Sequence, residues 1–321
     1  MRPGSRLTLG TGRAQRRSVK GPPRRGSGAG GAMSNKIQFH NVSKTFAVKG
    51  PAGTKESARF TAIEDLNLDV RAGELMVLVG PSGCGKSTLI DLLGGLSKPS
   101  SGKLLLDGKP ITGPALDRGI VFQQYALFPW RTARENVEFG LEAKGVPESR
   151  RKEIAQDYLD LVSLSGFEDR YPHELSGGMK QRVAIARSLA YDPEVLMMDE
   201  PFAALDAQTR ESLQAELLRI WEKSRKTILF ITHSIDEAVF LGQRVAIMTS
   251  RPGRVKRVID IPEEIRGYED ARSTPEFGRL RHEIWTLLRE EVLKAEEQER
   301  SKRQKRAAES RPVAGVVAVN G

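Results

Sequence analysis

A glycine-rich octapeptide gives the first indication of chemistry in this sequence. Residues 80–87 read Gly-Pro-Ser-Gly-Cys-Gly-Lys-Ser and match the pattern G-x-x-x-x-G-K-[ST]. Glycines let the backbone curl so that N–H groups point at phosphate oxygens, and a following helix adds the positive end of its dipole. In such a loop, Lys86 reaches the β- and γ-phosphates of a nucleotide and Ser87 holds Mg²⁺. The alternative is a glycine-rich turn that binds nothing. The residues expected to line the nucleotide are Gly80, Pro81, Ser82, Gly83, Cys84, Gly85, Lys86, Ser87 and Thr88.

Cys84, the only cysteine, lies inside this loop. A position at a helix N-terminus favours the thiolate, but we prefer the interpretation that Cys84 is a small filler whose backbone matters more than its sulfur. Alkylation of Cys84 is nevertheless expected to block nucleotide binding. A single cysteine forms no intramolecular disulfide, so nothing indicates an oxidising compartment.

Two acidic residues follow a second apolar run. Val195-Leu196-Met197-Met198 ends in Asp199 and Glu200, and the carboxyl ends of buried strands are where α/β proteins bind ligands. Asp199 suits Mg²⁺ coordination, and Glu200 could polarise an attacking water molecule. Taken alone, the pattern is equally typical of a strand that ends at the surface. Together with the phosphate loop, it predicts a site for phosphoryl chemistry.

The elements that must position these residues alternate between apolar runs and helices. The runs at 75–79, 195–198, 227–231 and 245–248 have no polar alternation, which is typical of strands buried on both faces. A helix is expected from Lys86 to about Leu93, and residues 130–190 are expected to be helical. This order predicts a mostly parallel sheet covered on both faces, with a helical insert.

The net charge of +10 is concentrated at the N-terminus. Residues 1–32 hold eight basic residues and no acidic one, which leaves +2 for the rest of the chain. We therefore expect a disordered basic leader at 1–35, a near-neutral folded part, and no nucleic-acid partner. Met33 is our preferred start of the protein, and a polybasic tether to anionic lipid is the alternative for the leader. No run approaches the length of a membrane span, and no secretory signal is recognisable.

The character of the chain changes after residue 255. Residues 261–276 are polar and contain two prolines, which indicates a linker, whereas Phe277, Leu280, Ile284 and Leu288 recur at helical spacing. The segment 256–321 is therefore expected to be an extension with an amphipathic helix and a charged tail.

Further motifs carry a resemblance to a known family. Residues 175–182 read Leu-Ser-Gly-Gly-Met-Lys-Gln-Arg and are similar to the signature sequence of ATP-binding cassette (ABC) proteins. Gln123 resembles the Q-loop glutamine, Asp206 the D-loop aspartate, and His233 the switch histidine. Phe46 occupies the place of the family's adenine-stacking aromatic residue, with Phe60 as a weaker candidate. Each alone could be a solvated loop residue or a core residue, but together they follow the family's order over residues 36–255.

The resemblance implies an α/β fold of the P-loop NTPase type, with a mostly parallel core, an antiparallel β part and a helical subdomain at about 124–180. It implies ATP and Mg²⁺ as cofactors, with the ion held by Ser87, Gln123 and Asp199. It also implies catalysis of ATP hydrolysis by Glu200, His233, Gln123 and Lys86.

A second copy is part of this expectation. Ser176-Gly177-Gly178 begins a segment with helical spacing, so its N–H groups and dipole can serve an anion. In the family this anion is the γ-phosphate on the opposite subunit, so a second ATP-binding subunit is expected, in a homodimer.

The match narrows toward importers of small solutes. Leu127-Phe128-Pro129-Trp130 and residues 248–254 are similar to ATP-binding subunits of nitrate, sulfonate and taurine importers. This implies membrane permease subunits as partners, a solute-binding protein as an indirect partner, and a location on the cytoplasmic face of the cell membrane. The chain departs from the pattern in its leader, in a polar insert from Ala47 to Ala58 and in its longer tail. A soluble ABC ATPase without a transporter is the alternative function.

Overall fold

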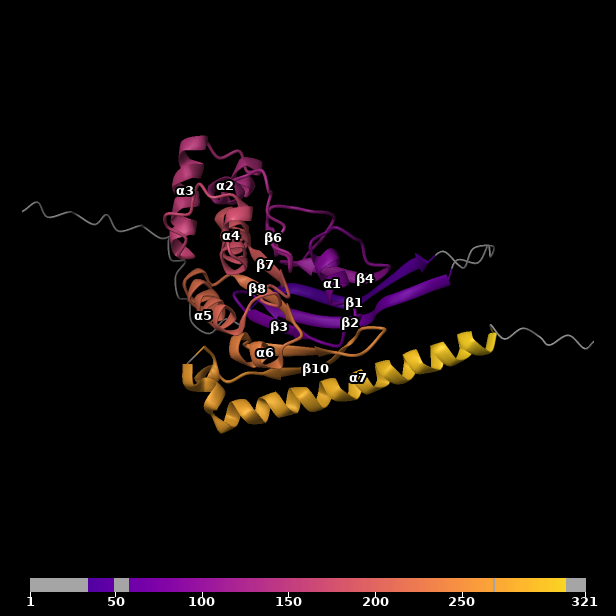
Figure 1. Ribbon diagram of the computed structural model, residues 1–321. Coiled ribbons are helices and arrows are strands. Elements are labelled where there is room, and N and C mark those ends of the chain that lie inside the picture. Colours follow the sequence, from indigo (N-terminus) through magenta and orange to yellow (C-terminus); the bar gives the residue numbers. More distant parts are fainter. Residues whose placement is uncertain (1–33, 49–57, 268, 310–321) are drawn as a thin grey trace, which may run out of the picture. The chain divides into compact units, whose positions relative to one another are not determined.

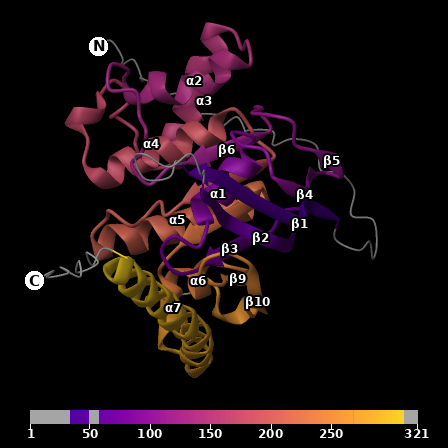
Figure 2. The ribbon, with the colours of Figure 1, turned by 90° about the vertical axis from the view of Figure 1, so that its right-hand side faces the viewer.

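The structure is a computed structural model that describes residues 34–48, 58–267 and 269–309. Most of the expected leader and most of the polar insert therefore lie outside the described residues, as does the end of the charged tail. The described residues form two sheets, which Figures 1 and 2 show in two perpendicular views.

The larger sheet carries the predicted buried strands side by side. Its order is β10-β9-β3-β8-β7-β6, and the five strands from β9 to β6 are parallel to one another. Only β10 pairs antiparallel, with β9. The expectation of a mostly parallel core is thus confirmed. The strands are β3 (Leu75–Val79), β6 (Arg118–Val121), β7 (Val195–Asp199), β8 (Thr227–Thr232), β9 (Arg244–Met248) and β10 (Val255–Asp260).

The smaller sheet is the antiparallel part of the fold. Its order is β2-β1-β4-β5, and every pair in it is antiparallel. The strands are β1 (Asn35–Val48), β2 (Ala58–Arg71), β4 (Ser101–Leu106) and β5 (Lys109–Pro110). Ile37, Phe39 and Val42 lie in β1 and are buried.

Two hydrophobic cores lie on the two faces of the larger sheet. Successive side chains of a strand point to opposite faces, so Leu75, Val77 and Val79 enter one core while Met76 and Leu78 enter the other. The second core contains the smaller sheet and α1 (Lys86–Leu93). Every residue of β3 and β8 is buried, which explains their uninterrupted apolar sequences.

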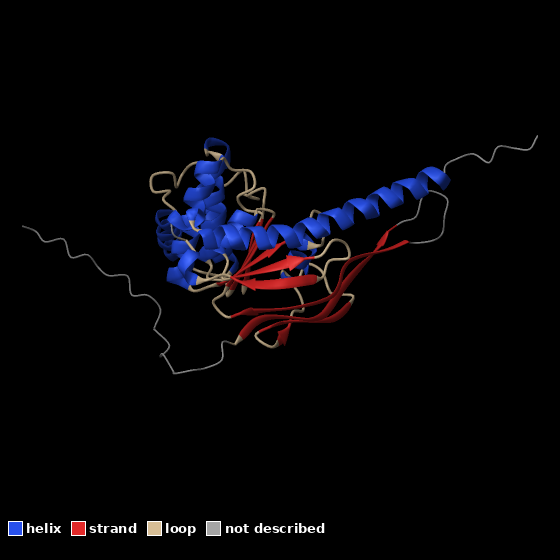
Figure 3. Ribbon diagram, turned by 90° about the horizontal axis from the view of Figure 1, so that it is seen from below, coloured by secondary structure: helices blue, strands red, loops and turns tan. Residues whose placement is uncertain are grey.

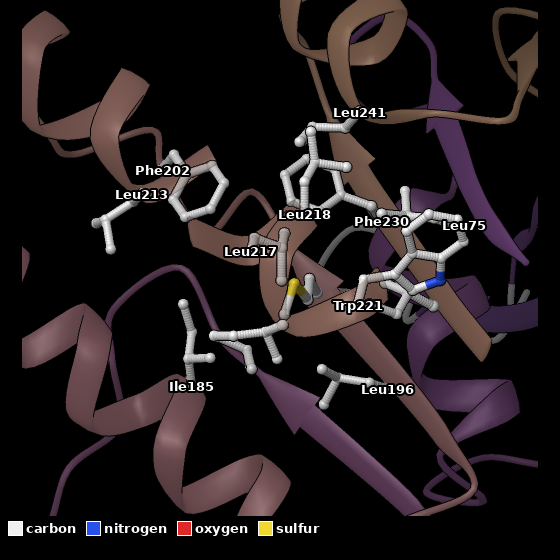
Figure 4. Close-up of a cluster of buried hydrophobic side chains, with 14 of the residues drawn as sticks. Leu75, Ile185, Leu196, Phe202, Leu213, Leu217, Leu218, Trp221, Phe230 and Leu241 are labelled. Carbon is white, nitrogen blue, oxygen red and sulfur yellow. The ribbon is translucent and has the colours of Figure 1, made fainter. Parts of the chain in front are cut away.

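The first core is covered by helices. Figure 4 shows Trp221 of α5 (Ala207–Ser224) beside Leu75 of β3, whereas Leu213 of the same helix lies beside Phe202 at the other side of the cluster. Helix α6 (Ile235–Leu241) adds Leu241 to the same cluster.

Residues 133–190 contain a group of helices that lie near one another in Figure 1. It consists of α2 (Ala133–Ala143), α3 (Glu148–Leu161), the 3₁₀ helix η1 (Pro172–Glu174) and α4 (Gly177–Ala190). Thr132 and Glu135 form a capping box that fixes the start of α2, and Ser176 caps α4 through the N–H of Met179.

The C-terminal part is packed more closely than the sequence suggested. The larger sheet continues through β10 to Asp260, beyond the expected boundary at 255. The expected linker instead forms η2 (Glu263–Ile265) and η3 (Glu269–Ser273), because Ile261, Ile265 and Ala271 are buried in the first core. The chain then enters the long helix α7 (Pro275–Glu309), which lies in front of the strands in Figure 3. Among the described residues, no helix has the length and apolar character that crossing a bilayer requires.

Candidate functional site

The glycine-rich octapeptide forms the loop between β3 and α1, the context that the motif requires. Gly85 has φ +99°, and a Cβ atom there would lie 2.9 Å from Cγ1 of Ile63, so only glycine fits without strain. Lys86 is nearly buried, and its Nζ atom donates to the carbonyl oxygens of Gly80 at 2.8 Å and Pro81 at 3.2 Å. The cation is therefore held within the loop itself.

Two side chains at the end of β7 meet a residue of α1 and a residue that follows β8. The hydroxyl of Ser87 donates to Oδ2 of Asp199 at 3.2 Å. Burial raises the pKa of the Asp199 carboxyl, while the Ser87 hydrogen bond opposes that shift. Nδ1 of His233, which follows β8, lies 3.1 Å from Oε2 of Glu200. The structure thus brings these four predicted site residues together in two pairs.

Glu200 has an unusual backbone. Its φ is +46°, a left-handed conformation that costs a residue with a side chain free energy, and its N–H donates to the carbonyl of Ile231 at 2.9 Å. Strained residues of this kind concentrate at functional sites.

An open hollow of about 290 Å³ joins most of these groups. Lys86, Ser87 and Glu200 line it, together with the loop residues Ser82, Gly83, Gly85 and Thr88. Its remaining lining residues are Phe60, Ala62 and Arg251. The hollow therefore combines a phosphate-binding loop and a carboxylate with an aromatic side chain, which is the combination that a nucleotide needs.

The aromatic residue in the hollow is Phe60. Phe46 lies on β1 opposite Phe60 of β2, and their rings stack with centroids 6.5 Å apart. Phe46 is more than one-third exposed and lies beside the hollow's lining rather than in it. The weaker of the two sequence candidates is thus the one on the wall of the hollow.

Cys84 is a buried thiol. Its side chain is 1% exposed, and its Sγ atom lies 3.9 Å from Sδ of Met248. Burial raises the pKa of this thiol, and the nearby Lys86 only partly offsets the effect. Burial therefore outweighs the effect of the helix N-terminus, and the buried thiol is consistent with the preferred interpretation of Cys84 as a small filler.

The other predicted site residues lie elsewhere in the chain. Ser176, Gly177 and Gly178 begin α4, where a Cβ atom on Gly178 would lie 2.6 Å from Cγ2 of Thr209. Asp206 caps α5 by accepting from the N–H of Thr209 at 3.0 Å, which lowers the pKa of its carboxyl. Gln123 is exposed in the loop after β6. None of these five residues lines the hollow at the phosphate loop.

The sequence analysis did not identify Arg251 as a site residue. It follows β9, which lies beside β3 in the parallel part of the sheet, so it reaches the same edge as the phosphate loop. The signal was available in the apolar run 245–248, which predicts a buried strand, and in the basic residue three positions after its end.

Fold and site together define a P-loop nucleotide hydrolase. The family model described as "ABC transporter" matches residues 63–203. The chain is 52% identical over 263 residues to an uncharacterized ABC transporter ATP-binding protein of Methanocaldococcus jannaschii, covering 82% of this chain and 95% of that protein.

Two further relatives have more specific names. The nitrate import ATP-binding protein NrtD of Synechocystis sp. is 52% identical over 71% of this chain and 88% of its own length. The taurine import ATP-binding protein TauB of Roseobacter denitrificans is 46% identical over 78% of this chain and 93% of its own length.

Among solved structures, a dimeric post-hydrolysis state of an ATP-binding cassette bound to ADP and Pi is similar, with a TM-score of 0.61 and 33% identity. The match covers 70% of this chain and 99% of the solved cassette. The chain therefore belongs to the ABC transporter ATP-binding proteins, and it is an ATPase of that family.

Proposed function

We propose that this chain is the ATP-hydrolysing subunit of an importer for nitrate, a sulfonate, taurine or a similar small solute. The observation that carries the proposal is the meeting of the phosphate loop, Asp199, Glu200 and His233 at the carboxyl ends of the adjacent strands β3, β7 and β8. The names of the two importer relatives supply the class of solute.

The loop would bind ATP through its phosphates. Gly80–Thr88 would supply N–H donors and the N-terminus of α1, and Lys86 would exchange its bonds to the loop carbonyls for bonds to phosphate oxygens. Phe60, or Phe46 next to it, would offer a ring to the adenine base. Ser82 and Gly83 line the same hollow.

The protein oxygens present suit Mg²⁺. Ser87 and Asp199 already face each other at 3.2 Å, and an ion held by one or two protein oxygens completes its shell with water and phosphate, as Mg²⁺ prefers. Gln123 would be the third protein group. Bound there, the ion would neutralise charge on the β- and γ-phosphates.

Hydrolysis needs a water molecule aimed at the γ-phosphorus, and Glu200 is the residue placed for it. An Nδ1 proton on His233 can be donated to the Glu200 carboxylate across the 3.1 Å contact, which holds the side chain over the hollow. Lys86 and His233 would stabilise negative charge on the phosphoryl group, and Gln123 would sense it.

A test follows from Glu200→Gln, which keeps the size of the side chain and removes its charge. We expect ATP affinity within about twofold of wild type and turnover lowered by about 100-fold or more. Turnover and equilibrium binding of ATP are measured on the same preparations. Turnover at the wild-type rate would remove Glu200 from this role.

A second cassette is needed because the signature residues of one chain lie apart from its own hollow. Ser176, Gly177 and Gly178 present a helix N-terminus, and Asp206 caps the next helix, so these groups are available to a nucleotide on another copy. The similar solved cassette is dimeric. We infer a homodimer that binds two ATP molecules head to tail.

Aromatic residues that follow Gln123 in the chain would provide the surface for a permease on the cytoplasmic face of a membrane. Trp130 is 71% exposed and its ring contacts Phe128, whose ring contacts Phe139. Buried Asn136 bonds the backbone of residues 128–132 four times, which holds this loop rigid. A rigid patch of exposed aromatic side chains is typical of a protein interface.

The transport role is tested by purifying the tagged chain from membranes of its native host in mild detergent. We expect a multispanning permease to copurify, and we expect Trp130→Ala to reduce the permease recovered while leaving ATP turnover of the isolated chain unchanged. A solute-binding protein found with the permease can be screened with nitrate, alkanesulfonates and taurine. Recovery of the chain with soluble partners alone would overturn the importer proposal and favour the soluble ATPase.

A further inference from the structure

The turn between β9 and β10 is fixed against the nucleotide hollow. Within the turn, the hydroxyl of Thr249 donates to the carbonyl of Pro252 and accepts from the N–H of Arg254. The N–H of Gly253 donates to the carbonyl of Ala62 at 2.9 Å, and the N–H of Glu64 donates to the carbonyl of Gly253 at 3.1 Å. The turn is therefore attached to β2, the strand that carries Phe60.

Arg251 projects from this turn onto two parts of the hollow. Its Nε donates to the carbonyl of Gly83 in the phosphate loop at 3.1 Å, and its guanidinium carbon lies 4.4 Å from the ring centroid of Phe60. A Cβ atom on Gly83 would lie 2.6 Å from a terminal nitrogen of Arg251, so the glycine leaves room for this approach. A cation over a ring face is an attractive arrangement, and arginine also stacks on flat rings.

The lining of the hollow offers groups for both parts of a nucleotide. Lys86, Ser87 and Glu200 suit the phosphates and an attacking water molecule, whereas Phe60 and Arg251, which contact each other, suit a planar base. Arg251 is exposed, so the face of its guanidinium turned away from Phe60 is available to a planar ring.

We propose that Arg251 is a further nucleotide-binding residue that contacts the base by stacking, and that Glu291 of α7 positions it. The proposal rests on the nucleotide site described above. It adds a nucleotide-binding residue that the phosphate-loop motif does not contain, and it gives helix α7 a role in that site.

The link to α7 runs through the residue before Arg251. Oε2 of Glu291 accepts from the N–H of Ser250 at 2.9 Å and from its hydroxyl at 3.3 Å, and Oε1 accepts from Lys256 at 2.9 Å. The Glu291 side chain is 2% exposed, so its carboxylate is a buried anchor for the turn. The same helix contributes Leu288 and Val292 to a hollow shared with Pro81 and His233. Helix α7 thus reaches the phosphate loop through this hollow and the turn of Arg251 through Glu291.

The role of Arg251 is tested by equilibrium binding of ATP, ADP and inorganic tripolyphosphate to the full chain. We expect Arg251→Ala to weaken ATP and ADP by similar factors of about fivefold to tenfold and to leave tripolyphosphate within about twofold. Arg254→Ala is the matched control, because Arg254 lies in the same turn but pairs with Glu64 outside the hollow. We expect it to change each affinity by less than about twofold.

Lys86→Ala separates the two proposals. If wild type binds ATP and Lys86→Ala does not, the nucleotide site stands, and the effect of Arg251→Ala then decides the inference. Unchanged ATP affinity in Arg251→Ala, an equal loss in Arg254→Ala, or an equal loss for tripolyphosphate would each overturn base stacking by Arg251.

The positioning role of Glu291 is tested by a double-mutant cycle with Arg251→Ala. We expect Glu291→Gln to weaken ATP by about threefold in wild type and to have almost no effect when Arg251 is already alanine. Glu290→Gln, a neighbouring change on the exposed side of α7, is the control and should leave ATP affinity unchanged. A Glu291→Gln protein that loses thermal stability but keeps wild-type ATP affinity would show that Glu291 is only structural.

Discussion

The buried carboxylate of Glu291 is expected to make a measurable contribution to the stability of the fold. It accepts hydrogen bonds from the Ser250 backbone, Lys256 and Lys294, so it joins α7 to β10 and to the turn before it. Burial by itself would raise the pKa of this carboxyl, but the hydrogen bonds from Lys256, Ser250 and Lys294 and the charge of Lys256 outweigh burial and lower the pKa to about 2.

The size and sign of the effect follow from this shift. A carboxyl whose pKa falls from 4.5 in the unfolded chain to about 2 in the folded protein stabilises the fold by about 3 kcal/mol at pH 7. Because the folded pKa is the lower one, the contribution is complete above pH 4.5 and is lost as pH falls toward 2. At pH 3.5 about 1.4 kcal/mol of it is already gone.

Glu291→Gln removes this charge at nearly constant shape. We expect an unfolding free energy lower by about 2 to 3 kcal/mol at pH 7, and a melting temperature lower by about 5 to 10 °C. Urea unfolding at pH 7, 5 and 4 measures the difference, which should narrow between pH 5 and pH 4. The control is Glu290→Gln, since Glu290 also bonds Lys256 but is half exposed, and we expect it to cost less than about 1 kcal/mol. Equal losses in the two variants, or a Glu291→Gln loss that stays constant with pH, would refute this reasoning.

Two further predictions concern the loop and the signature. The thiol of Cys84 is buried with a raised pKa, so its reaction with iodoacetamide at pH 7.5 should be at least about tenfold slower in the folded than in the unfolded chain. The Sγ atom lies so close to the backbone of Gly80 that a Cβ atom there would be 2.7 Å away, so an alkyl group on the sulfur has no room beside the phosphate loop. Complete alkylation should therefore abolish nucleotide binding. Unchanged affinity after full labelling would contradict this. Gly178→Ala places a methyl group 2.6 Å from Cγ2 of Thr209 at the start of α4. We expect ATP turnover, measured by steady-state hydrolysis, to fall by about tenfold or more. The ATP affinity of a single chain, measured by equilibrium binding, should stay within about twofold of wild type. Turnover at the wild-type rate would argue against a role for this helix start.

The central strands could be predicted because their surroundings are uniform. β3 and β8 are buried at every position, and β7 and β9 are buried at all but one, so the sequence shows apolar runs without polar alternation in all four strands. β6 is a member of the same sheet, but it is four residues long and contains Arg118 and Gly119. Its place depends on pairing with β7, which is information that a local pattern does not contain.

The region 261–276 was expected to be a linker but is packed against the fold. Its prolines and charges are typical of a linker, yet three isolated apolar side chains, Ile261, Ile265 and Ala271, hold it against the first core. Such widely spaced contacts have no period, so they cannot be recognised without the surface that they meet.

The site residues also divide into those that belong to local sequence motifs and those that only the fold brings together. Lys86, Ser87, Asp199 and Glu200 lie in contiguous motifs whose chemistry depends on local backbone geometry, so their sequence is sufficient to predict them. Phe60 and Arg251 are far apart in the chain, and neither belongs to a motif of the phosphate loop. They meet because β9 lies beside β3 and because the turn after β9 is hydrogen-bonded to β2. The proposed base-binding part of the site therefore depends on the sheet order, whereas the phosphate loop is recognised from its sequence alone. Variation in the base-binding part can change how tightly a nucleotide is held without altering the motif that identifies the family.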